Sequence, residues 1–340
     1  MTQTAPDISA VSLDAIRATS EDLQGDVIRT PCLTLETGLM ARILGGGAAV
    51  LKLECFQHTG TFKARGALSV ARSLDADQLA RGVTAASAGN HAIAVAWAAR
   101  QVGASAKVVI QSNANPYRVA LACAEQAEVI MKPPGAETFA EADRLVADEG
   151  RFFIHPFEGT LTSCGTGGVG LELMEDAPDL DAVVVSIGGG GLISGIAAAV
   201  KQINPVCKVY GVEPEGAASM HTSVAKGAPV HLEQVNTIAD SLGAPMALPM
   251  GHALCTAYVD DIMLLDDETI CAGMIAFQEE AKLAVEPAAG AALAAVMGPL
   301  RARLQGKRVG VIVCGANIDS ATYMRLMQRG AARYAELIKG

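Results

Sequence analysis

Short apolar runs alternate with helical patterns along almost the whole chain, and this alternation constrains the fold more than any other feature. Strands without internal polar positions are typical of parallel sheets that helices cover on both faces. The predicted strands are 49–55, 106–111, 128–132, 151–156, 181–188, 208–214 and 308–315. The clearest helical patterns between them are 91–103, 116–127, 138–150 and 192–203. The sequence therefore predicts an α/β protein with open, twisted, mostly parallel sheets flanked by helices.

One closed barrel and two open lobes are both compatible with such an alternation. The predicted strands are irregularly spaced, and glycine-rich turns gather at a few strand–helix junctions, which favours two open lobes. A chain of 340 residues is long enough for both lobes. Because ligands of open sheets bind beyond the carboxyl ends of the strands, we expect the functional site at these junctions.

Composition excludes several classes of partner. Charged residues make up 18% of the chain, the net charge is −10 and aromatic residues reach only 4%, so a nucleic-acid partner is not expected. The longest apolar tract, "LAVEPAAGAALAAVMGPL", contains Glu286 and two prolines, which argues against a membrane span. The eight cysteines are scattered without metal-ligand spacing, and no signal-peptide pattern opens the sequence. We therefore expect a cytoplasmic protein with reduced thiols.

The first junction with chemical content is "VVVSIGGGGLISG". A predicted strand runs into Gly188, Gly189, Gly190 and Gly191, and a helix begins near Leu192. Four glycines allow successive backbone N–H groups to converge on one anion, and the helix N-terminus adds its dipole. The alternative is a flexible strand–helix turn, but four consecutive glycines are entropically costly. The motif matches neither a nucleotide-binding GxGxxG nor a P-loop, so it favours the phosphate of a phosphorylated cofactor.

Two other junctions are less specific. In "ASAGNHAIAVA", Ser87, Ala88, Gly89, Asn90 and His91 end one strand and open a helix, where backbone donors and a hydroxyl suit a carboxylate and the amide suits a phenolic oxygen. An ordinary helix cap explains the same residues equally well.

In "VIVCGANID", a buried strand ends at Cys314. Read alone, Cys314 is a small hydrophobic core residue, and no neighbouring histidine pattern indicates a thiol nucleophile.

The stretch "QHTGTFKARGALSV" places Lys63 and Arg65 at the start of a helix, the end that disfavours cations. A solvent-exposed lysine is the simplest explanation of Lys63 alone. A desolvated lysine, however, has a lowered pKa and forms imines with aldehydes. An imine-forming lysine combined with a phosphate-binding turn is what pyridoxal phosphate requires.

These motifs resemble the fold-type II pyridoxal-phosphate enzymes, whose fold is that of the tryptophan synthase β chain, and within them the serine/threonine dehydratases and serine racemases. "RTPCLTL", "ECFQHTGTFKARGA", "SAGNHA", "GGGGL", "EPAAGAALAA" and "CGANID" are similar to family motifs in the family's order. The resemblance covers nearly the whole chain. It implies a large cofactor-binding domain formed by 1–70 and 160–340, a small domain of 71–159, and a cofactor in the cleft between these lobes.

The resemblance also implies roles for individual residues. Lys63 is expected to hold the cofactor covalently, Phe62 to pack on its ring, Asn90 to bond its phenolic oxygen and Cys314 to face its pyridine nitrogen. The implied cofactor-binding residues are Lys63, Phe62, Asn90, Gly188, Gly189, Gly190, Gly191, Leu192 and Cys314. The implied substrate-carboxylate loop contains Ser87, Ala88, Gly89 and His91. A neutral thiol opposite the ring nitrogen favours elimination over long-lived carbanion chemistry.

The sequence departs from the family pattern at three positions. Ala88 stands where the racemases carry a serine as second acid/base, so little racemisation is expected. The family's divalent-cation site (Mg²⁺ or Ca²⁺) corresponds to Glu213, the carbonyl of Ala217 and an acidic third ligand, but the third position is Ser219. Glu213 is explained equally well as an ordinary carboxylate at a strand end. Ser241 replaces the usual glycine of "ADG".

The resemblance implies a dehydratase (ammonia-lyase) that converts an L-hydroxy amino acid to a 2-oxo acid and ammonia, with threonine and serine as leading substrates. The alternatives are a serine racemase and a dehydratase of another β-hydroxy amino acid, such as 3-hydroxyaspartate or phenylserine. A non-catalytic amino-acid sensor is a remote alternative. The resemblance further implies a homodimer or homotetramer.

Overall fold

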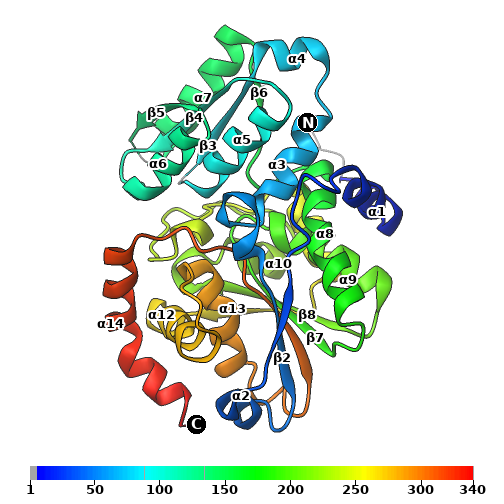
Figure 1. The fold of residues 1–340 in the computed structure, drawn as a ribbon, viewed down its shortest axis with the longest axis vertical. Coiled ribbons are helices and arrows are strands. Elements are labelled where there is room, and N and C mark those ends of the chain that lie inside the picture. Colours follow the sequence, from blue (N-terminus) through cyan, green and yellow to red (C-terminus); the bar gives the residue numbers. More distant parts are fainter. Residues whose placement is uncertain (1–5, 88, 134, 340) are drawn as a thin grey trace.

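The computed structural model describes residues 6–87, 89–133 and 135–339. Their strands form two sheets, one of six strands in the order β1-β2-β10-β7-β8-β9 and one of four in the order β5-β4-β3-β6 (Figure 1). Strand β1 is antiparallel to β2, and the other described strand pairs are parallel. The predicted fold class, two open and mostly parallel sheets flanked by helices, is confirmed.

The strands of the six-stranded sheet come from both ends of the chain. They are β1 (Cys32–Leu35), β2 (Ala48–Lys52), β7 (Ala182–Ser186), β8 (Lys208–Pro214), β9 (Asp261–Leu265) and β10 (Arg308–Ile312). The strands of the four-stranded sheet follow one another in the middle of the chain. They are β3 (Val83–Ser87), β4 (Ala106–Gln111), β5 (Glu128–Lys132) and β6 (Phe152–Phe153). The predicted domains, 1–70 with 160–340 and 71–159, stay a prediction.

Helices cover both faces of each sheet, as parallel strand connections require. The helices are α1 (Leu13–Asp22), α2 (Gly38–Ile43), α3 (Lys63–Arg72), α4 (Ala76–Arg81), α5 (Asn90–Gln101), α6 (Pro116–Ala124), α7 (Ala136–Glu149), α8 (Thr160–Asp176), α9 (Gly191–Ile203), α10 (Ser219–Lys226), α11 (Pro249–Tyr258), α12 (Asp267–Ala276), α13 (Pro287–Met297) and α14 (Ser320–Leu337). In Figure 1, α8 and α9 lie on one side of the six-stranded sheet and α12 to α14 on the other. No helix among the described residues has the length and hydropathy needed to cross a membrane.

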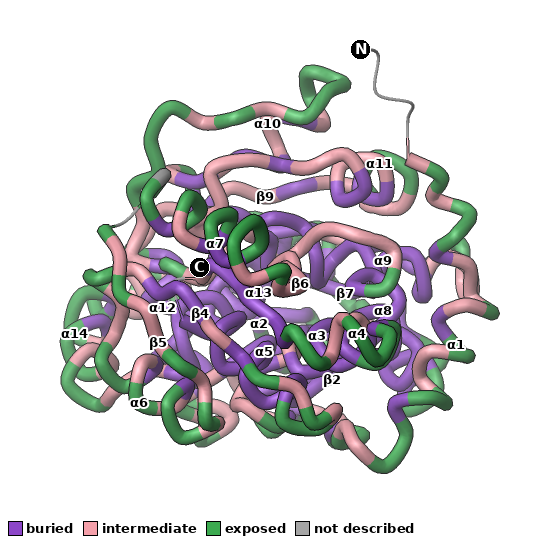
Figure 2. The backbone as a smooth tube through the Cα atoms, turned by 90° about the horizontal axis from the view of Figure 1, so that it is seen from above, coloured by how far each residue is buried: buried purple, intermediate pink, exposed green. Residues whose placement is uncertain are grey.

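Each sheet has its own hydrophobic core. The larger core packs β2, β7, β8 and β10 against α9, α12 and α13, and a second core packs β3 and β4 against α3 and α5. The buried backbone in the interior of both sheets is visible in Figure 2. Helix α3 contacts α5 on one side and α8 on the other, so it lies between the two parts of the molecule. The helix that begins at Lys63 therefore has a fixed position relative to both sheets.

Two strands of the six-stranded sheet were absent from the sequence prediction. Strand β1 is short and only partly buried, which gives it no continuous apolar signal. Strand β9 is largely apolar but follows a helix at a short interval and lies at the sheet edge. The predicted strand 151–156 is reduced to Phe152–Phe153, because the following residues turn into the loop that leads to α8.

Candidate active site

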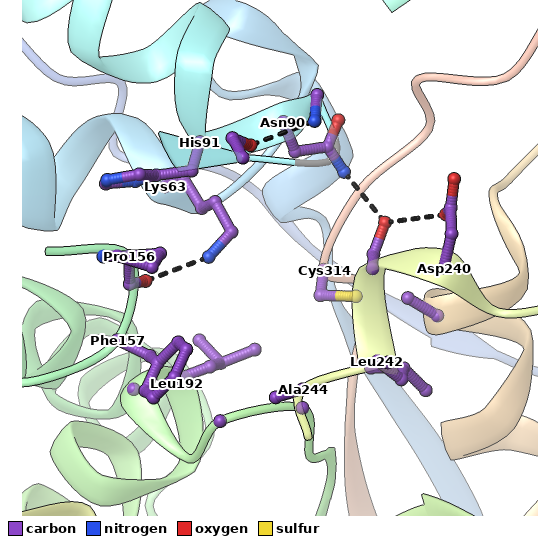
Figure 3. A pocket seen from close by; sticks show the side chains of 18 of the residues that line it. Lys63, Asn90, His91, Pro156, Phe157, Leu192, Asp240, Leu242, Ala244 and Cys314 are labelled. Carbon is purple, nitrogen blue, oxygen red and sulfur yellow. Dashed lines mark hydrogen bonds between the residues drawn. The ribbon is translucent and has the colours of Figure 1, made fainter. Parts of the chain in front are cut away.

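A cavity lies between the two sheets, and the residues that line it come from the strand–helix junctions singled out in the sequence (Figure 3). The junctions after β3, β7 and β10 contribute Ser87 to His91, Gly188 to Leu192, and Cys314. The start of α3 contributes Phe62 and Lys63. Residues more than 250 positions apart in the chain are thus brought into one cavity.

Lys63 is partly buried on the cavity wall, and its Nζ donates a hydrogen bond to the carbonyl of Pro156 at 3.0 Å (Figure 3). Burial lowers the pKa of its amine to about 8, against the opposing effects of Glu286 and Cys314. At pH 7 roughly one amine in ten is unprotonated with this pKa, whereas an ordinary lysine would be almost fully protonated. The cavity therefore contains a lysine amine with a lowered pKa, and its role as the amine that holds the cofactor stays a prediction.

The tetraglycine turn has the conformation of an anion-binding loop. Gly190 has a φ of +96°, which favours glycine. A Cβ on Gly189 would lie 2.3 Å from the ring of Phe157, and one on Gly191 would lie 2.6 Å from the Cα of Phe157. Among the described residues, no side chain caps the N-terminus of α9, so its N–H groups are available to an anion. The residues fit the phosphate of pyridoxal phosphate.

The loop after β3 forms the opposite wall. The Oγ of Ser87 accepts a hydrogen bond from the N–H of Gly89 at 2.9 Å. His91 is buried, and its Nε2 lies 2.8 Å from the carbonyl of Ile154. Burial, followed by the charge of Lys63, lowers the pKa of His91 to about 3, so its ring is neutral. Ala88 lies outside the described residues, and the roles of this loop toward a substrate stay predictions.

The amide of Asn90 lines the cavity but is already engaged. Its Nδ2 lies 2.9 Å from each carboxylate oxygen of Glu286 and 3.2 Å from the Oγ of Ser241. Its Oδ1 accepts a hydrogen bond from the Nδ2 of Asn317 at 2.9 Å. The predicted contact of Asn90 with a phenolic oxygen therefore has to share the Nδ2 group with Glu286, and it stays a prediction.

Cys314 and the lysine segment are adjacent. The N–H of Phe62 donates to the carbonyl of Cys314 at 3.1 Å, which fixes the start of α3 against the end of β10. The Cys314 thiol lines the cavity (Figure 3). Burial, and then the carboxylate of Glu286, raise its pKa well above the usual value, so the thiol is neutral. A neutral group at this position is what the sequence predicted, and its placement opposite a ring nitrogen stays a prediction.

Sequence reasoning assigned no role to two charged residues of this cavity. Glu286 directly precedes α13 and is 2% exposed, and Arg118 of α6 is 3% exposed. Their closest contact is 3.3 Å, between Nη2 of Arg118 and Oε2 of Glu286. The available signals were a lone arginine in the apolar pattern 116–127 and the glutamate of "EPAAGAALAA". Neither signal indicates that Arg118 and Glu286 form an ion pair, because only the fold brings them together.

The predicted cation site at Glu213 and Ala217 does not fit a divalent ion. Both carboxylate oxygens of Glu213 accept backbone N–H groups at the start of α10, from Met220 at 2.8 Å and from His221 at 2.7 Å. The third position, Ser219, offers only a buried hydroxyl. In the part of the chain that the structure describes, no three His, Cys, Asp or Glu side chains are grouped to hold a metal. Glu213 therefore serves as a helix cap.

Comparison with known proteins decides the family. The family model "Pyridoxal-phosphate dependent enzyme" matches residues 23–315. This chain belongs to that family. A phenylserine dehydratase from Ralstonia pickettii is 45% identical over 329 residues, which cover 97% of this chain and 98% of that protein. An L-threonine ammonia-lyase from Thermotoga maritima is 35% identical over 324 residues, covering 95% and 80%.

The solved structures agree with this assignment. The structure of maize serine racemase matches with a TM-score of 0.88 and 34% identity, covering 96% of this chain and 99% of that one. The predicted family, fold and cofactor are confirmed: this pyridoxal-phosphate enzyme carries the lysine and the glycine turn in one cavity. The similar proteins include a dehydratase, an ammonia-lyase and a racemase, so the family alone does not fix the substrate.

Proposed function

We propose that this enzyme removes water from an L-β-hydroxy amino acid and releases a 2-oxo acid and ammonia, with a β-aryl substrate such as phenylserine preferred over threonine and serine. The desolvated amine of Lys63, in one cavity with the glycine turn and a neutral thiol, is the observation that carries the reaction class. The 45% identity to a phenylserine dehydratase, against 35% to a threonine ammonia-lyase, supports the aryl substrate.

The backbone N–H groups of Gly188 to Leu192 would hold the cofactor's phosphate, and Lys63 would hold its aldehyde carbon. When bound, pyridoxal phosphate supplies the electron sink for the pair left by the broken Cα–H bond. Nζ of Lys63, released when the substrate's amino group takes its place on that carbon, would be the free amine that removes the α-proton. Its pKa of about 8 in the cofactor-free cavity favours the unprotonated form at neutral pH more than an ordinary lysine's pKa does. The β-hydroxyl would leave as water with the proton that Lys63 removed from the α-carbon, and one water would then hydrolyse the remaining C–N bond to give the 2-oxo acid and ammonia.

Two features of the residues favour elimination over racemisation. The neutral thiol of Cys314 carries no charge that would hold a protonated ring nitrogen. Racemisation also needs a proton donor on the face opposite Lys63, and Ala88 provides no such group. His91 is neutral and its Nε2 is engaged with the carbonyl of Ile154. A serine racemase is therefore the less favoured alternative.

The lining of the cavity includes residues that suit an apolar β-substituent. Phe139 of α7, Gly243, Ala244 and Pro245 all line the cavity and are small or apolar. Among the described lining residues the cationic side chains are Lys63 and Arg118, and Arg118 already binds two carboxylates. A second substrate carboxylate, as in 3-hydroxyaspartate, would find no unpaired cation there.

A substrate panel with the cofactor-loaded protein tests this proposal. We expect phenylserine to give a 2-oxo acid with a kcat/KM at least about tenfold above that of threonine or serine, since an aryl group buries substantially more apolar surface than a methyl group. Lys63→Ala should abolish turnover, whereas Lys226→Ala, at an exposed lysine of α10, should not. Equal or greater turnover of threonine would refute the aryl preference. Amino-acid binding without turnover of any substrate would favour the sensor.

The wall residue offers a second test. Phe139→Ala should lower kcat/KM for phenylserine more than for threonine, because only the aryl substrate reaches this wall. The matched control is Val146→Ala, since both residues lie on α7 and are 39% and 38% exposed, but Val146 does not line the cavity. An equal loss for both substrates would contradict the assignment of Phe139 to the aryl subsite.

The assembly is part of the same proposal. We expect a homodimer or homotetramer, as the family resemblance implies, with a small amino acid as the substrate. Light scattering of the loaded enzyme measures the mass directly, and the mass of a single 340-residue chain would contradict this expectation.

A further inference from the structure

Four buried residues form a closed ring of hydrogen bonds, and three of them, Asn90, Arg118 and Glu286, line the cavity. Arg118 donates from Nη2 to Oε2 of Glu286 at 3.3 Å, and Asn90 donates from Nδ2 to both oxygens of Glu286 at 2.9 Å. Asn317 donates from Nδ2 to Oδ1 of Asn90 at 2.9 Å, and Arg118 donates from Nε to the carbonyl of Asn317 at 2.8 Å. None of the four is more than 5% exposed.

The ring joins the two halves of the molecule. Asn90 and Arg118 start α5 and α6, which connect strands of the four-stranded sheet. Glu286 precedes α13 and Asn317 follows β10, both parts of the six-stranded sheet and its helices. Members from the two halves alternate around the ring, so each hydrogen bond in it crosses the cavity wall from one half to the other.

A further contact extends the ring to the cavity rim. Nη1 of Arg118 binds Oδ2 of Asp240 at 2.7 Å, and the side chain of Asp240 is 45% exposed. Ser241, the residue that departs from the family's glycine, accepts from Asn90 at 3.2 Å. One guanidinium thus binds three segments that are distant in sequence, at positions 240, 286 and 317.

The aliphatic part of Arg118 supports the substrate loop from behind. Gly89 has a φ of +143°, a conformation that favours glycine, and a Cβ there would lie 2.4 Å from Cδ of Arg118. The backbone of Gly89 therefore packs directly on the arginine stem. The same side chain touches the loop at Gly89 and, through Glu286, at Asn90.

We propose that Arg118 is a positioning residue of this enzyme: its stem and its guanidinium hold Gly89 and Asn90 in the orientation that cofactor and amino acid require, and they tie the two halves together across the cavity. A guanidinium suits this task because it presents five donors in a rigid fork. A lysine ammonium carries the same charge but cannot reproduce the fork. Removing the charge leaves Glu286 buried with amide donors only.

The test compares Arg118→Lys, Arg118→Met, Glu286→Gln and the double variant Arg118→Met/Glu286→Gln with the wild-type enzyme. Cofactor affinity is measured on the stripped protein by fluorescence, without any amino acid, so this readout stands even if the proposed substrate is wrong. KM and kcat are then measured with whichever amino acid the loaded enzyme turns over. The matched control is Arg100→Met, an exposed arginine of α5 that pairs with Glu125.

Arg118→Met should raise the cofactor dissociation constant and the amino-acid KM by about tenfold each, the size of one lost charge-assisted hydrogen bond, with a smaller fall in kcat. Arg118→Lys should recover part of both losses. The double variant should bind better than Arg118→Met, because its buried carboxylate is gone. Arg100→Met should stay within about twofold of wild type.

Two results would overturn the proposal. One is an Arg118→Met enzyme whose cofactor affinity and KM both lie within about twofold of wild type. The other is a double variant whose fold-losses in cofactor affinity and KM equal the product of the losses of Arg118→Met and Glu286→Gln. Such a product would show that the two residues act independently of each other. If Arg118→Met does not fold, Arg118→Lys provides the test. An unchanged KM and cofactor affinity in Arg118→Lys would contradict the claim that the geometry of the guanidinium is required.

Discussion

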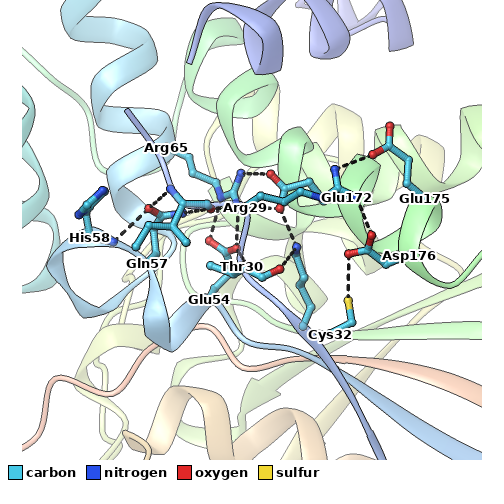
Figure 4. Close-up of polar contacts among 12 residues, drawn as sticks. Arg29, Thr30, Cys32, Glu54, Gln57, His58, Arg65, Glu172, Glu175 and Asp176 are labelled. Carbon is cyan, nitrogen blue, oxygen red and sulfur yellow. Dashed lines mark hydrogen bonds and ion pairs between the residues drawn. The ribbon is translucent and has the colours of Figure 1, made fainter. Parts of the chain in front are cut away.

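Arg65 and Arg118 are both buried arginines that bind two carboxylates, but the two clusters differ in geometry. Arg65 uses Nε, Nη1 and Nη2 to contact both oxygens of Glu54 and both oxygens of Glu172, at 2.7 to 2.9 Å (Figure 4). Lys52 adds a second cation to Glu172 at 2.6 Å. Arg118 reaches Asp240 and Glu286 through one oxygen each, at 2.7 and 3.3 Å.

We infer that the Arg65 cluster stabilises the fold, whereas the Arg118 cluster acts at the cavity. The Arg65 cluster joins α3 to α8 and to the end of β2, and it is buried. Its members Lys52, Glu54, Arg65 and Glu172 are not among the described residues that line the cavity. It explains why an arginine stands two residues after Lys63: its charge is neutralised while it fixes the helix that carries the lysine. The Arg118 cluster has an exposed member, spans both sheets and leaves Glu286 with a raised pKa because of burial.

The largest expected effect is on stability at the Arg65 cluster. Arg65→Met should lower the free energy of unfolding by about 3–5 kcal/mol, because it leaves two buried carboxylates with Lys52 as their remaining cation. Arg118→Met should cost clearly less, since Glu286 can take up a proton and Asp240 is open to solvent. Urea unfolding of both variants measures the difference. A larger loss for Arg118→Met would reverse the comparison.

Lys63 contributes an effect of opposite sign. Its pKa is about 8 in the folded, cofactor-free protein and 10.5 in the unfolded chain. The unfolded chain therefore binds more protons between pH 8 and 10.5, and the cost of burying the ammonium, on the order of 3 kcal/mol, is fully present below pH 8.

Cofactor-free Lys63→Met should accordingly be more stable than wild type at pH 7. The difference should shrink as the pH rises through 8 toward 10.5, and thermal unfolding across this range is the measurement. A Lys63→Met protein less stable than wild type at pH 7 would show that the amine is not desolvated.

The smallest effect concerns the two glutamates. Glu286 raises the pKa of the Lys63 amine, so Glu286→Gln should lower the pH at which cofactor-free protein begins to capture pyridoxal phosphate. In the wild type, capture should rise with pH to a plateau above about 8, as the free amine forms. Glu54→Gln, in the Arg65 cluster, should leave this pH midpoint in place. An equal shift of the pH midpoint in Glu286→Gln and Glu54→Gln would contradict the claim that only the Arg118 cluster acts on Lys63.

The sequence predicted those parts of the fold and site that depend on local pattern. The apolar strand–helix alternation gave the two sheets, and the glycine turn and Lys63 indicated a phosphorylated aldehyde cofactor. The ring of Asn90, Arg118, Glu286 and Asn317 could not be predicted, because its members meet only through crossover connections between the sheets. No periodic pattern in the sequence indicates that Arg118 and Glu286 contact each other.

The same reasoning explains where sequence predictions were less secure. Glu213 stands at the end of β8, where the family resemblance implied a cation ligand. Its role as a cap depends on how α10 begins, which the sequence does not specify. The cavity-lining residues Phe139 and 243–245, which we propose to contact an aryl substrate, likewise come from a helix and a loop that are distant in the sequence.

The central claim is that Lys63 carries pyridoxal phosphate against the glycine turn, and reduction with borohydride followed by peptide mass spectrometry tests it most directly. The account predicts that the cofactor-loaded protein acquires one phosphopyridoxyl group, on the peptide containing Lys63. It also predicts that prior addition of inorganic phosphate slows loading of the stripped protein, by competing for the turn. An unmodified Lys63, or the group on another lysine, would contradict the account.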